Sequence, residues 1–288
     1  MKRNSIKAPL DLHAQLGLRP EQSLALLKAL HIVTRDGGIN QDSRRKLKQV
    51  NHLLQFLAPL IATSLAERGK VDVVDHGSGK SYLGFMLYDR YLKSMTEPHH
   101  VYGIETREDL VSRARELASD ANFSQMSFLN LAAAEASAAN TLPERVEIVT
   151  ALHACDTATD DAISFALAKD AKFVVLVPCC QAEVAALFRD DKGRALAKSA
   201  LTELWRHPIQ AREFGAHVTN VLRGLRLEAH GYKVTVTELV GWEHSMKNEL
   251  IVAERKHSAN SVFVQTAKDK LESMLSTLGL SRLRERFS

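Results

Sequence analysis

Cysteine is scarce in this chain: three residues among 288, namely Cys155, Cys179 and Cys180. An odd number of cysteines in a long chain argues against a disulfide scaffold, and no Cys-x-x-Cys or Cys/His spacing suggests a zinc site. No stretch approaches the roughly 18 consecutive apolar residues of a membrane-spanning helix, and the N-terminal segment MKRNSIKAPLDLH lacks the apolar core of a secretion signal. These absences predict a soluble, cytoplasmic protein without a metal site or a membrane partner.

The composition also lacks any extreme. Hydrophobic residues make up 45% of the chain and charged residues 25%. This is an ordinary globular composition, sufficient for one large core and a small appended domain. The formal net charge of +4 is compatible with a nucleic-acid partner, because proteins that bind nucleic acids carry an excess of lysine and arginine.

After Gly69, short apolar runs alternate with helical segments, which predicts a parallel sheet with helices on both faces. The five runs that predict parallel strands cover residues 71–76, 100–105, 126–131, 146–154 and 172–179. Two further strands, at 232–240 and 249–256, are separated by eight residues, too few for a helical crossover, so they should pair antiparallel. We therefore predict an α/β fold with a mostly parallel seven-stranded sheet and an antiparallel last strand.

The same pattern predicts three parts of the chain. Residues 1–45 are polar and broken by Pro9 and Pro20, which predicts an N-terminal helical and basic extension. Residues 46–256 contain the strand–helix alternation and should form the main domain. Residues 257–288 should form a C-terminal helix that ends in a frayed basic tail.

The turn after the first strand, Asp75-His76-Gly77-Ser78-Gly79-Lys80-Ser81, has the glycines of a cofactor-binding loop. A P-loop requires a glycine five residues before Gly79, but Val74 stands there. The dinucleotide fingerprint G-x-G-x-x-G requires a glycine where this chain has Tyr82. Both phosphate-binding interpretations are therefore disfavoured.

The remaining pattern, Asp75-x-Gly77-x-Gly79, resembles the first motif of class I S-adenosylmethionine (SAM) methyltransferases, D-x-G-x-G-x-G, with Ser81 in place of the third glycine. Glycines let the backbone approach the methionine part of SAM, and an acid at the strand end organises its ammonium group. Glu105 ends the second strand, 26 residues after Gly79, where a carboxylate in a doubly wound fold accepts hydrogen bonds from ribose hydroxyls.

The resemblance implies a Rossmann-like class I methyltransferase fold with SAM as the cofactor. Near the adenine, many such enzymes have an Asp after the third strand. This chain has Leu131 and Ala132 there, and we expect apolar contacts to the ring. The residues predicted to contact the cofactor are Asp75, His76, Gly77, Ser78, Gly79, Glu105, Leu131 and His153.

Polar and reactive side chains follow the fourth and fifth strands. The fourth strand ends LHACDTATD and the fifth ends VPCCQ, and the carboxyl ends of such strands are where open α/β sheets bind ligands. These segments and the later EHSMKNELIVAER resemble methyltransferases of the methyltransferase-like-25 family and the tRNA 2′-O-methyltransferase family. Their motifs read roughly H-x-C-G-x-x-T-D and P-C-C-H, whereas this chain has Asp156 for the Gly and Gln181 for the His.

That resemblance covers about residues 45–256 and implies RNA as the substrate class. Methyl transfer to a 2′-hydroxyl needs alignment and a base or cation near the nucleophile. RNA 5-methylcytosine enzymes instead use two cysteines, and Cys155 and Cys179 have that layout, although the Asp-Pro-Cys motif of those enzymes is absent. Candidate catalytic residues are His153, Asp156, Cys179, Cys180, Lys247 and Asn248.

Three functional hypotheses remain open at this stage. The leading one is a SAM-dependent methyltransferase of tRNA or rRNA, with phosphate contacts from Arg212, His217, Arg223 and the basic residues of 44–48. The second is methylation of a protein or a small molecule by the same fold. The third is a non-catalytic scaffold that keeps a SAM-binding pocket.

Overall fold

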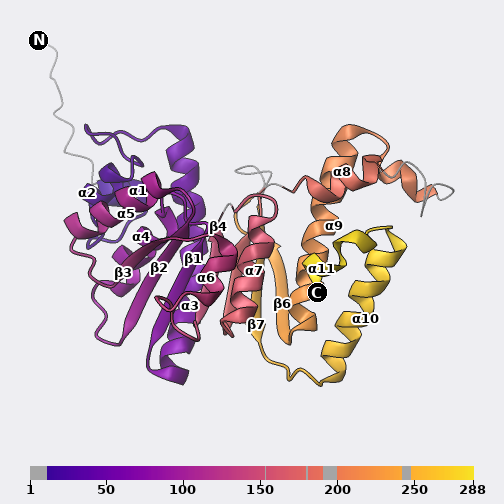
Figure 1. Cartoon of the computed structure of the whole chain (residues 1–288). Helices are drawn as coiled ribbons and strands as arrows, with labels where there is room; N and C mark the ends of the chain where they lie inside the picture. The colour runs from indigo at the N-terminus through magenta and orange to yellow at the C-terminus, as the bar shows by residue number, and fades with distance from the viewer. Residues whose placement is uncertain (1–11, 153, 180, 191–199, 242–247) are drawn as a thin grey trace, which may run out of the picture.

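One seven-stranded sheet organises the chain (Figure 1). The computed structural model describes residues 12–152, 154–179, 181–190, 200–241 and 248–288. The strands are β1 (Val71–His76), β2 (His99–Glu105), β3 (Met126–Asn130), β4 (Ile148–Leu152), β5 (Phe173–Val177), β6 (Tyr232–Glu238) and β7 (Glu249–Arg255). Their order across the sheet is β3-β2-β1-β4-β5-β7-β6.

The directions of the strands confirm the predicted fold class. β1 pairs parallel to β2 and β4, β2 to β3, and β4 to β5. β7 inserts between β5 and β6 and is antiparallel to both. The last strand is therefore the antiparallel one, in a mixed sheet whose other strands are parallel.

The helices in chain order are α1 (Leu12–Leu16), α2 (Leu24–Ala29), α3 (Gln41–Arg68), α4 (Tyr82–Leu87), α5 (Glu108–Asp120), α6 (Ala133–Ala138), α7 (Ala158–Ala168), α8 (Glu183–Asp190), α9 (Pro208–Ala229), α10 (Val262–Thr277) and α11 (Arg284–Phe287). A π-helical segment, η1 (Tyr88–Leu92), and two 3₁₀ segments, η2 (Ala200–Trp205) and η3 (Ser281–Leu283), complete the elements. None of the helices within the described ranges is long and apolar enough to cross a membrane.

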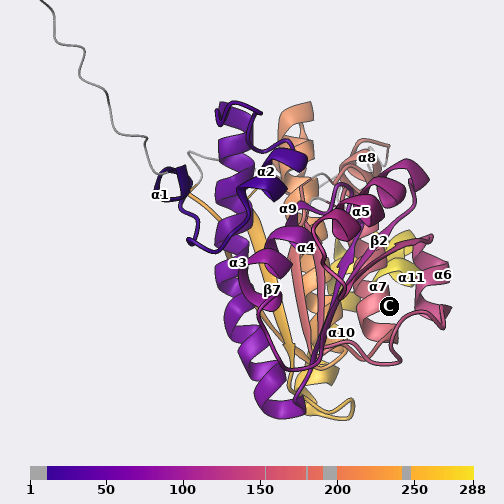
Figure 2. The same ribbon diagram turned by 90° about the vertical axis from the view of Figure 1, so that its left-hand side faces the viewer.

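Two apolar clusters cover the two faces of the sheet, as expected for strands that are apolar on both sides. One cluster joins α2, α3, α4 and α5 to the face that carries Val73 and Val175. The other joins α6, α7 and part of α9 to the face that carries Val74 and Val174. Figure 2 shows α3 and α7 on opposite sides of the sheet. Successive residues of β1 therefore face different helices, which separates Asp75 from His76.

The helix α3 crosses the predicted boundary between residues 45 and 46. Its N-cap is Asn40, whose side chain accepts a hydrogen bond from the Ser43 backbone N–H at 2.8 Å. The helix then runs without a break to Arg68 and ends at Gly69, which has a left-handed backbone. Its first turns thus belong to the same rigid element as the part that packs on β1.

The C-terminal part is packed, so the prediction of a frayed tail is wrong. Phe287 is buried with α8, α9 and α10 in a third apolar cluster. Arg284 pairs with Glu272, and Arg286 pairs with Glu183 at 3.2 Å. The arginines that suggested a solvated tail instead fasten α11 to neighbouring helices.

Candidate functional site

The glycine turn between β1 and α4 has three residues with left-handed backbone. They are Gly77 (φ +68°), Gly79 (φ +56°) and Ser81 (φ +52°). This region favours glycine, which explains the alternating glycines and shows that Ser81 occupies the conformation of the missing third glycine. The Ser78 N–H donates to the Ile104 carbonyl at 2.9 Å, and the Ser81 N–H donates to the Ser78 carbonyl at 2.7 Å. The turn is thereby fixed against the end of β2.

Glu105 at the end of β2 holds the turn from the other side. Its Oε2 accepts hydrogen bonds from the Gly79 N–H at 2.8 Å and from Arg107 Nη2 at 3.2 Å. Its Oε1 accepts from the Thr106 and Arg107 N–H groups and from Arg107 Nε. Burial alone would raise the pKa of Glu105, but the hydrogen bonds and charge of Arg107 and the Gly79 N–H hold it below its usual value. Glu105 is therefore an ionised acceptor at neutral pH.

Asp75 presents a second carboxyl group at the same turn. It is 3% exposed, and the Thr150 hydroxyl donates to its Oδ1 at 3.2 Å. Burial, opposed by the Thr150 hydrogen bond and reinforced by the charge of Glu105, raises the pKa of Asp75 to about 7. An acid with this pKa ionises readily when a cation approaches it.

The turn opens into a pocket of about 230 Å³ that Asp75 and Gly77 line together with Leu152 at the end of β4. The N-terminal part of α3 also lines this pocket, through Lys46, Gln49 and Val50, and Tyr82, Leu83, Lys80 and Arg107 contribute as well. The part that α3 plays in the pocket was not predicted from the sequence, because its N-terminal turns lie more than 20 residues before β1 and carry no motif linked to the glycine turn.

His76 points away from this pocket. It is 4% exposed, and its ring lies 5.7 Å from the ring of Phe165 on α7, centroid to centroid. Neither ring nitrogen has a hydrogen-bond partner among the described residues. Burial lowers the pKa of His76 to about 4, so the ring is neutral. The cofactor contacts predicted for His76 and for Leu131, which is half-buried beside the second apolar cluster, stay predictions.

The ends of β4 and β5 bring two thiols together. Cys155 Sγ and Cys179 Sγ lie 3.4 Å apart. Beside them, Asp156 has a left-handed backbone (φ +49°), which explains why the related motif has a glycine there. Its Oδ1 accepts a hydrogen bond from the Ala182 N–H at 3.2 Å. The Asp156 carboxylate therefore ties the two strand ends together, and its role as a base stays a prediction.

Asn248 joins the last two strands. It is buried, and its Oδ1 accepts hydrogen bonds from the Leu239 N–H at 3.2 Å and the Val240 N–H at 3.5 Å. These bonds occupy its side-chain oxygen in the hairpin. Three other predicted site residues, His153, Cys180 and Lys247, lie outside the described residues.

Arg223 was predicted to contact phosphate, and that prediction is wrong. Its side chain is fully buried on α9 and forms a bidentate ion pair with Asp160, with both N···O distances at 2.8 Å. Its Nη2 also donates to the Asp156 carbonyl at 2.7 Å. A guanidinium enclosed in this way cannot reach a substrate. Arg212 and His217 on the same helix are exposed.

Arg223 belongs to a buried polar network that the sequence did not reveal. Asn220 Oδ1 accepts from Arg223 Nη1 at 3.2 Å and from Gln181 Nε2 at 3.0 Å. Asn220 Nδ2 donates to Glu249 Oε2 at 2.9 Å. The available signal was the pair of polar residues three positions apart on an otherwise apolar helix face. The network links α9 to the ends of β4, β5 and β7.

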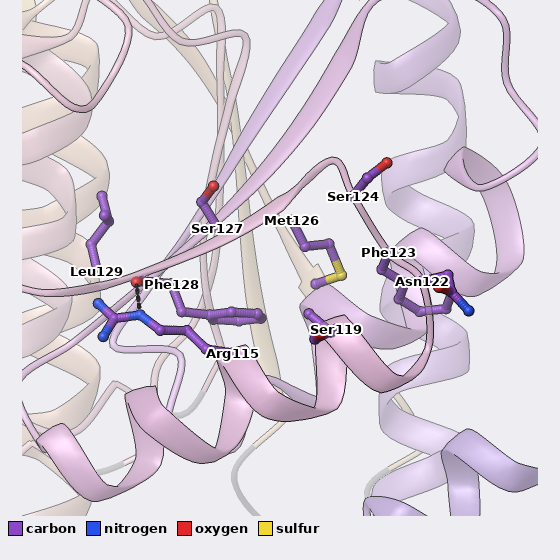
Figure 3. Close-up of a pocket in the computed structure, with 10 residues that line it drawn as sticks. Arg115, Ser119, Asn122, Phe123, Ser124, Met126, Ser127, Phe128 and Leu129 are labelled. Atoms are coloured by element: carbon purple, nitrogen blue, oxygen red, sulfur yellow. Dashed lines mark hydrogen bonds between the residues drawn. The ribbon is translucent and has the colours of Figure 1, made fainter.

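A larger pocket, of about 680 Å³, lies between α5 and the edge strand β3 (Figure 3). Arg115 is the one charged residue among those described as lining it. Its Nε donates to the Phe128 carbonyl at 2.9 Å, as the dashed line shows. The residues described as lining this pocket include serines but no carboxylate, histidine or cysteine, so we place the candidate site at the glycine turn.

Comparison with known proteins agrees with that placement. Residues 45–187 match the family model described as a methyltransferase domain. No curated protein matches the sequence.

Solved structures with a similar fold include an rRNA methylase from Streptococcus thermophilus, at 11% identity and a TM-score of 0.43 over 70% of this chain and 93% of that one. They also include a magnesium protoporphyrin IX methyltransferase from Synechocystis PCC 6803 with bound S-adenosylhomocysteine (SAH), at 15% identity and a TM-score of 0.43 over 81% and 93% of the two chains. TM-scores this low carry no argument about the substrate.

Proposed function

We propose that this chain, whose residues 45–187 match a methyltransferase domain, is a SAM-dependent enzyme that methylates RNA of the tRNA or rRNA class. The domain match supports the enzyme class, and the glycine turn supports the cofactor. The observation that carries the assignment to this site is that turn, where Asp75 lines the pocket and the ionised Glu105 accepts a hydrogen bond from the Gly79 N–H. RNA is the substrate that best suits a basic chain with cationic side chains around that pocket.

The turn fits SAM on its own geometry. A Cβ at Gly79 would lie 3.7 Å from the Arg107 guanidinium and 4.0 Å from Glu105 Oε2, so a side chain there would fill the space in front of the acceptor. At Gly77, a Cβ would lie 3.6 Å from the Ala154 side chain, in ordinary van der Waals contact. The left-handed backbone of both residues adds strain to any substitution.

SAM, when bound, supplies a methyl group on a positively charged sulfur. Glu105 is placed to accept hydrogen bonds from ribose hydroxyls, and Asp75 to face the ammonium group. The pocket walls from α3 and β4 align the reactants, and alignment supplies much of the catalysis in a direct displacement. For a hydroxyl nucleophile, His153, Asp156 and Lys247 stay the proposed base or cation.

The finer resemblance to the methyltransferase-like-25 and tRNA 2′-O-methyltransferase families is part of this proposal. The left-handed backbone of Asp156 supports it, because this conformation accounts for the glycine in the related motif. Substrate assignment by resemblance still requires a direct test.

The test is mass spectrometry of nucleosides in RNA from cells with and without the gene. We expect one methylated nucleoside to disappear and to return with the wild-type gene but not with Glu105→Ala. Unchanged RNA together with clear stabilisation of the protein by SAH would favour a protein or small-molecule substrate. No stabilisation by millimolar SAH would overturn the cofactor site itself, since a ligand that binds the folded state raises its stability.

A further inference from the structure

Three cationic side chains from separate elements line the pocket at the glycine turn. Lys46 comes from α3, Lys80 from the turn and Arg107 from the segment between β2 and α5. Lys46 Nζ lies 5.5 Å from the centre of the Tyr82 ring, also a lining residue. All three side chains are exposed at the pocket mouth.

Lys80 is the most informative of the three. Within the described part of the chain it forms no ion pair or hydrogen bond, whereas Arg107 is paired with Glu105. Lys80 also lines the adjoining pocket, whose other charged lining residues are Arg113, Glu116 and Asp120. The two pockets therefore meet at Lys80, and in the adjoining pocket the two carboxylates offset the two cations.

The charged side chains around the pocket mouth have an excess of positive charge, which favours an anionic ligand. Three cations face one carboxylate that is fully ionised, Glu105, and one that is about half ionised at neutral pH, Asp75. SAM brings a further net positive charge, because its sulfonium and ammonium groups outweigh its one carboxylate. A loaded site of this kind repels cationic substrates and attracts a polyanion.

We propose that the RNA backbone crosses this mouth and that Lys46 and Lys80 hold consecutive phosphates, with the nucleotide to be methylated directed into the pocket. This inference rests on the proposed function and adds where the substrate binds. Of the phosphate contacts predicted from the sequence, it keeps Lys46 from the basic residues 44–48, omits Arg223, which is buried on α9, and adds Lys80 from the turn.

The experiment measures RNA affinity against salt with the full chain saturated with SAH. A labelled tRNA transcript is titrated by fluorescence anisotropy at several concentrations between about 50 and 200 mM salt. The variants are Lys46→Gln and Lys80→Gln, and the matched control is Lys268→Gln, an exposed lysine on α10 far along the chain.

We expect each pocket variant to weaken RNA binding about three- to tenfold at low salt and to reduce the salt slope by about one, as for the loss of one phosphate contact. The control should keep the wild-type slope. SAH affinity, measured by calorimetry, should stay within about twofold of wild type in both pocket variants, because the lysines serve the substrate.

Other outcomes overturn the inference in distinguishable ways. A steep wild-type salt slope that neither Lys46→Gln nor Lys80→Gln changes would remove this docking path and leave the RNA proposal standing. Loss of SAH affinity with unchanged RNA affinity would assign the lysines to the carboxylate of the cofactor. Wild-type protein that binds SAH but no RNA would overturn the proposed function and this inference together.

Discussion

Asp75 is the residue whose ionisation the cofactor should change. Its carboxyl group is buried at the end of β1 with a pKa of about 7. A positively charged ligand beside a carboxyl group stabilises the ionised form and lowers its pKa. The same side chain that is half protonated without cofactor is therefore expected to be a full carboxylate with SAM bound.

This shift predicts proton release when SAM binds. At pH 7 we expect about half a proton to leave per SAM bound, and SAM affinity to fall as the pH drops below about 7, because protonation of Asp75 competes with binding. Calorimetry in two buffers with different heats of ionisation measures the released proton. Asp75→Asn should abolish both effects, and equal binding heats in the two buffers would contradict the prediction.

The buried, neutral His76 leads to a second pH-dependent prediction, which concerns the stability of the fold. Its folded pKa of about 4 lies below the ordinary value of 6.5, so its contribution to stability is present above pH 6.5 and is lost as the pH falls through 4. The loss amounts to about 3 kcal/mol. In urea unfolding at a series of pH values, His76→Leu should lose less stability on acidification than wild type.

The control for His76 is an exposed histidine on α9. His217→Gln should keep the wild-type dependence of stability on pH. If His76→Leu followed the same curve as His217→Gln, the buried ring would not be the group that makes the fold sensitive to acid.

Substitution of the two thiols at the strand ends distinguishes direct in-line methyl transfer from transfer through a covalent enzyme–RNA intermediate. Cys155 and Cys179 lie 3.4 Å apart, the layout that a covalent mechanism would also use. In-line transfer predicts that Cys179→Ser changes kcat less than about tenfold, whereas loss of a nucleophile or its assisting thiol costs on the order of a thousandfold or more. Single-turnover assays with labelled SAM measure the difference, and a denaturation-stable RNA–protein adduct would support the covalent alternative.

At the scale of elements, α9 is attached to α7, the helix that follows β4, by the buried Arg223–Asp160 pair. Removal of one partner from such a pair leaves an unpaired buried charge and costs about 3–5 kcal/mol. We predict a loss of this size in urea unfolding for Arg223→Met. The double variant with Asp160→Asn should recover part of it, since the stranded charge is gone.

The matched control on the same helix is Arg212→Met. Arg212 is exposed and its ion pair with Glu213 is solvated, so the change should stay within about 0.5 kcal/mol. If Arg223→Met cost as little as Arg212→Met, the buried pair would not fasten α9 to the strand ends.

The strands were predictable because each is an unbroken apolar run bounded by polar turns. All seven observed strands fall within one or two residues of those expected from the sequence, as for 71–76, identical to β1. The start of α9 is harder to predict. The helix begins at Pro208, and a proline in the first turn is a common start signal, but polar residues in the turns that follow obscure the helical period.

Only those parts of the site that belong to a short sequence pattern could be predicted. The turn and Glu105 were found because glycine spacing and a strand-end acid are sequence patterns. Lys46 was expected among the basic residues that contact RNA, but its place in the pocket beside Gln49 was not predictable, because it depends on how α3 packs across the end of β1. Arg223 was misassigned because its charge alone says nothing about burial, and Asp160 lies 63 positions away.

At the scale of the whole molecule, the two faces of the sheet have different roles: one carries the pocket and the other carries the buried polar network. The face covered by α3, α4 and α5 carries the pocket and Asp75, and the opposite face, with α7 and α9, carries His76 and the buried network that holds the strand ends. The helix α3 is therefore part of the site, because it supplies one wall of the pocket.

The central claim is that this pocket transfers a methyl group from SAM to RNA. The most direct measurement is incubation of the purified chain with SAM labelled in its methyl group and unmodified tRNA and rRNA transcripts, followed by nucleoside analysis. We predict label in one methylated nucleoside with wild-type protein and none with Glu105→Ala. Protein that binds SAH yet leaves every RNA unlabelled would contradict the claim.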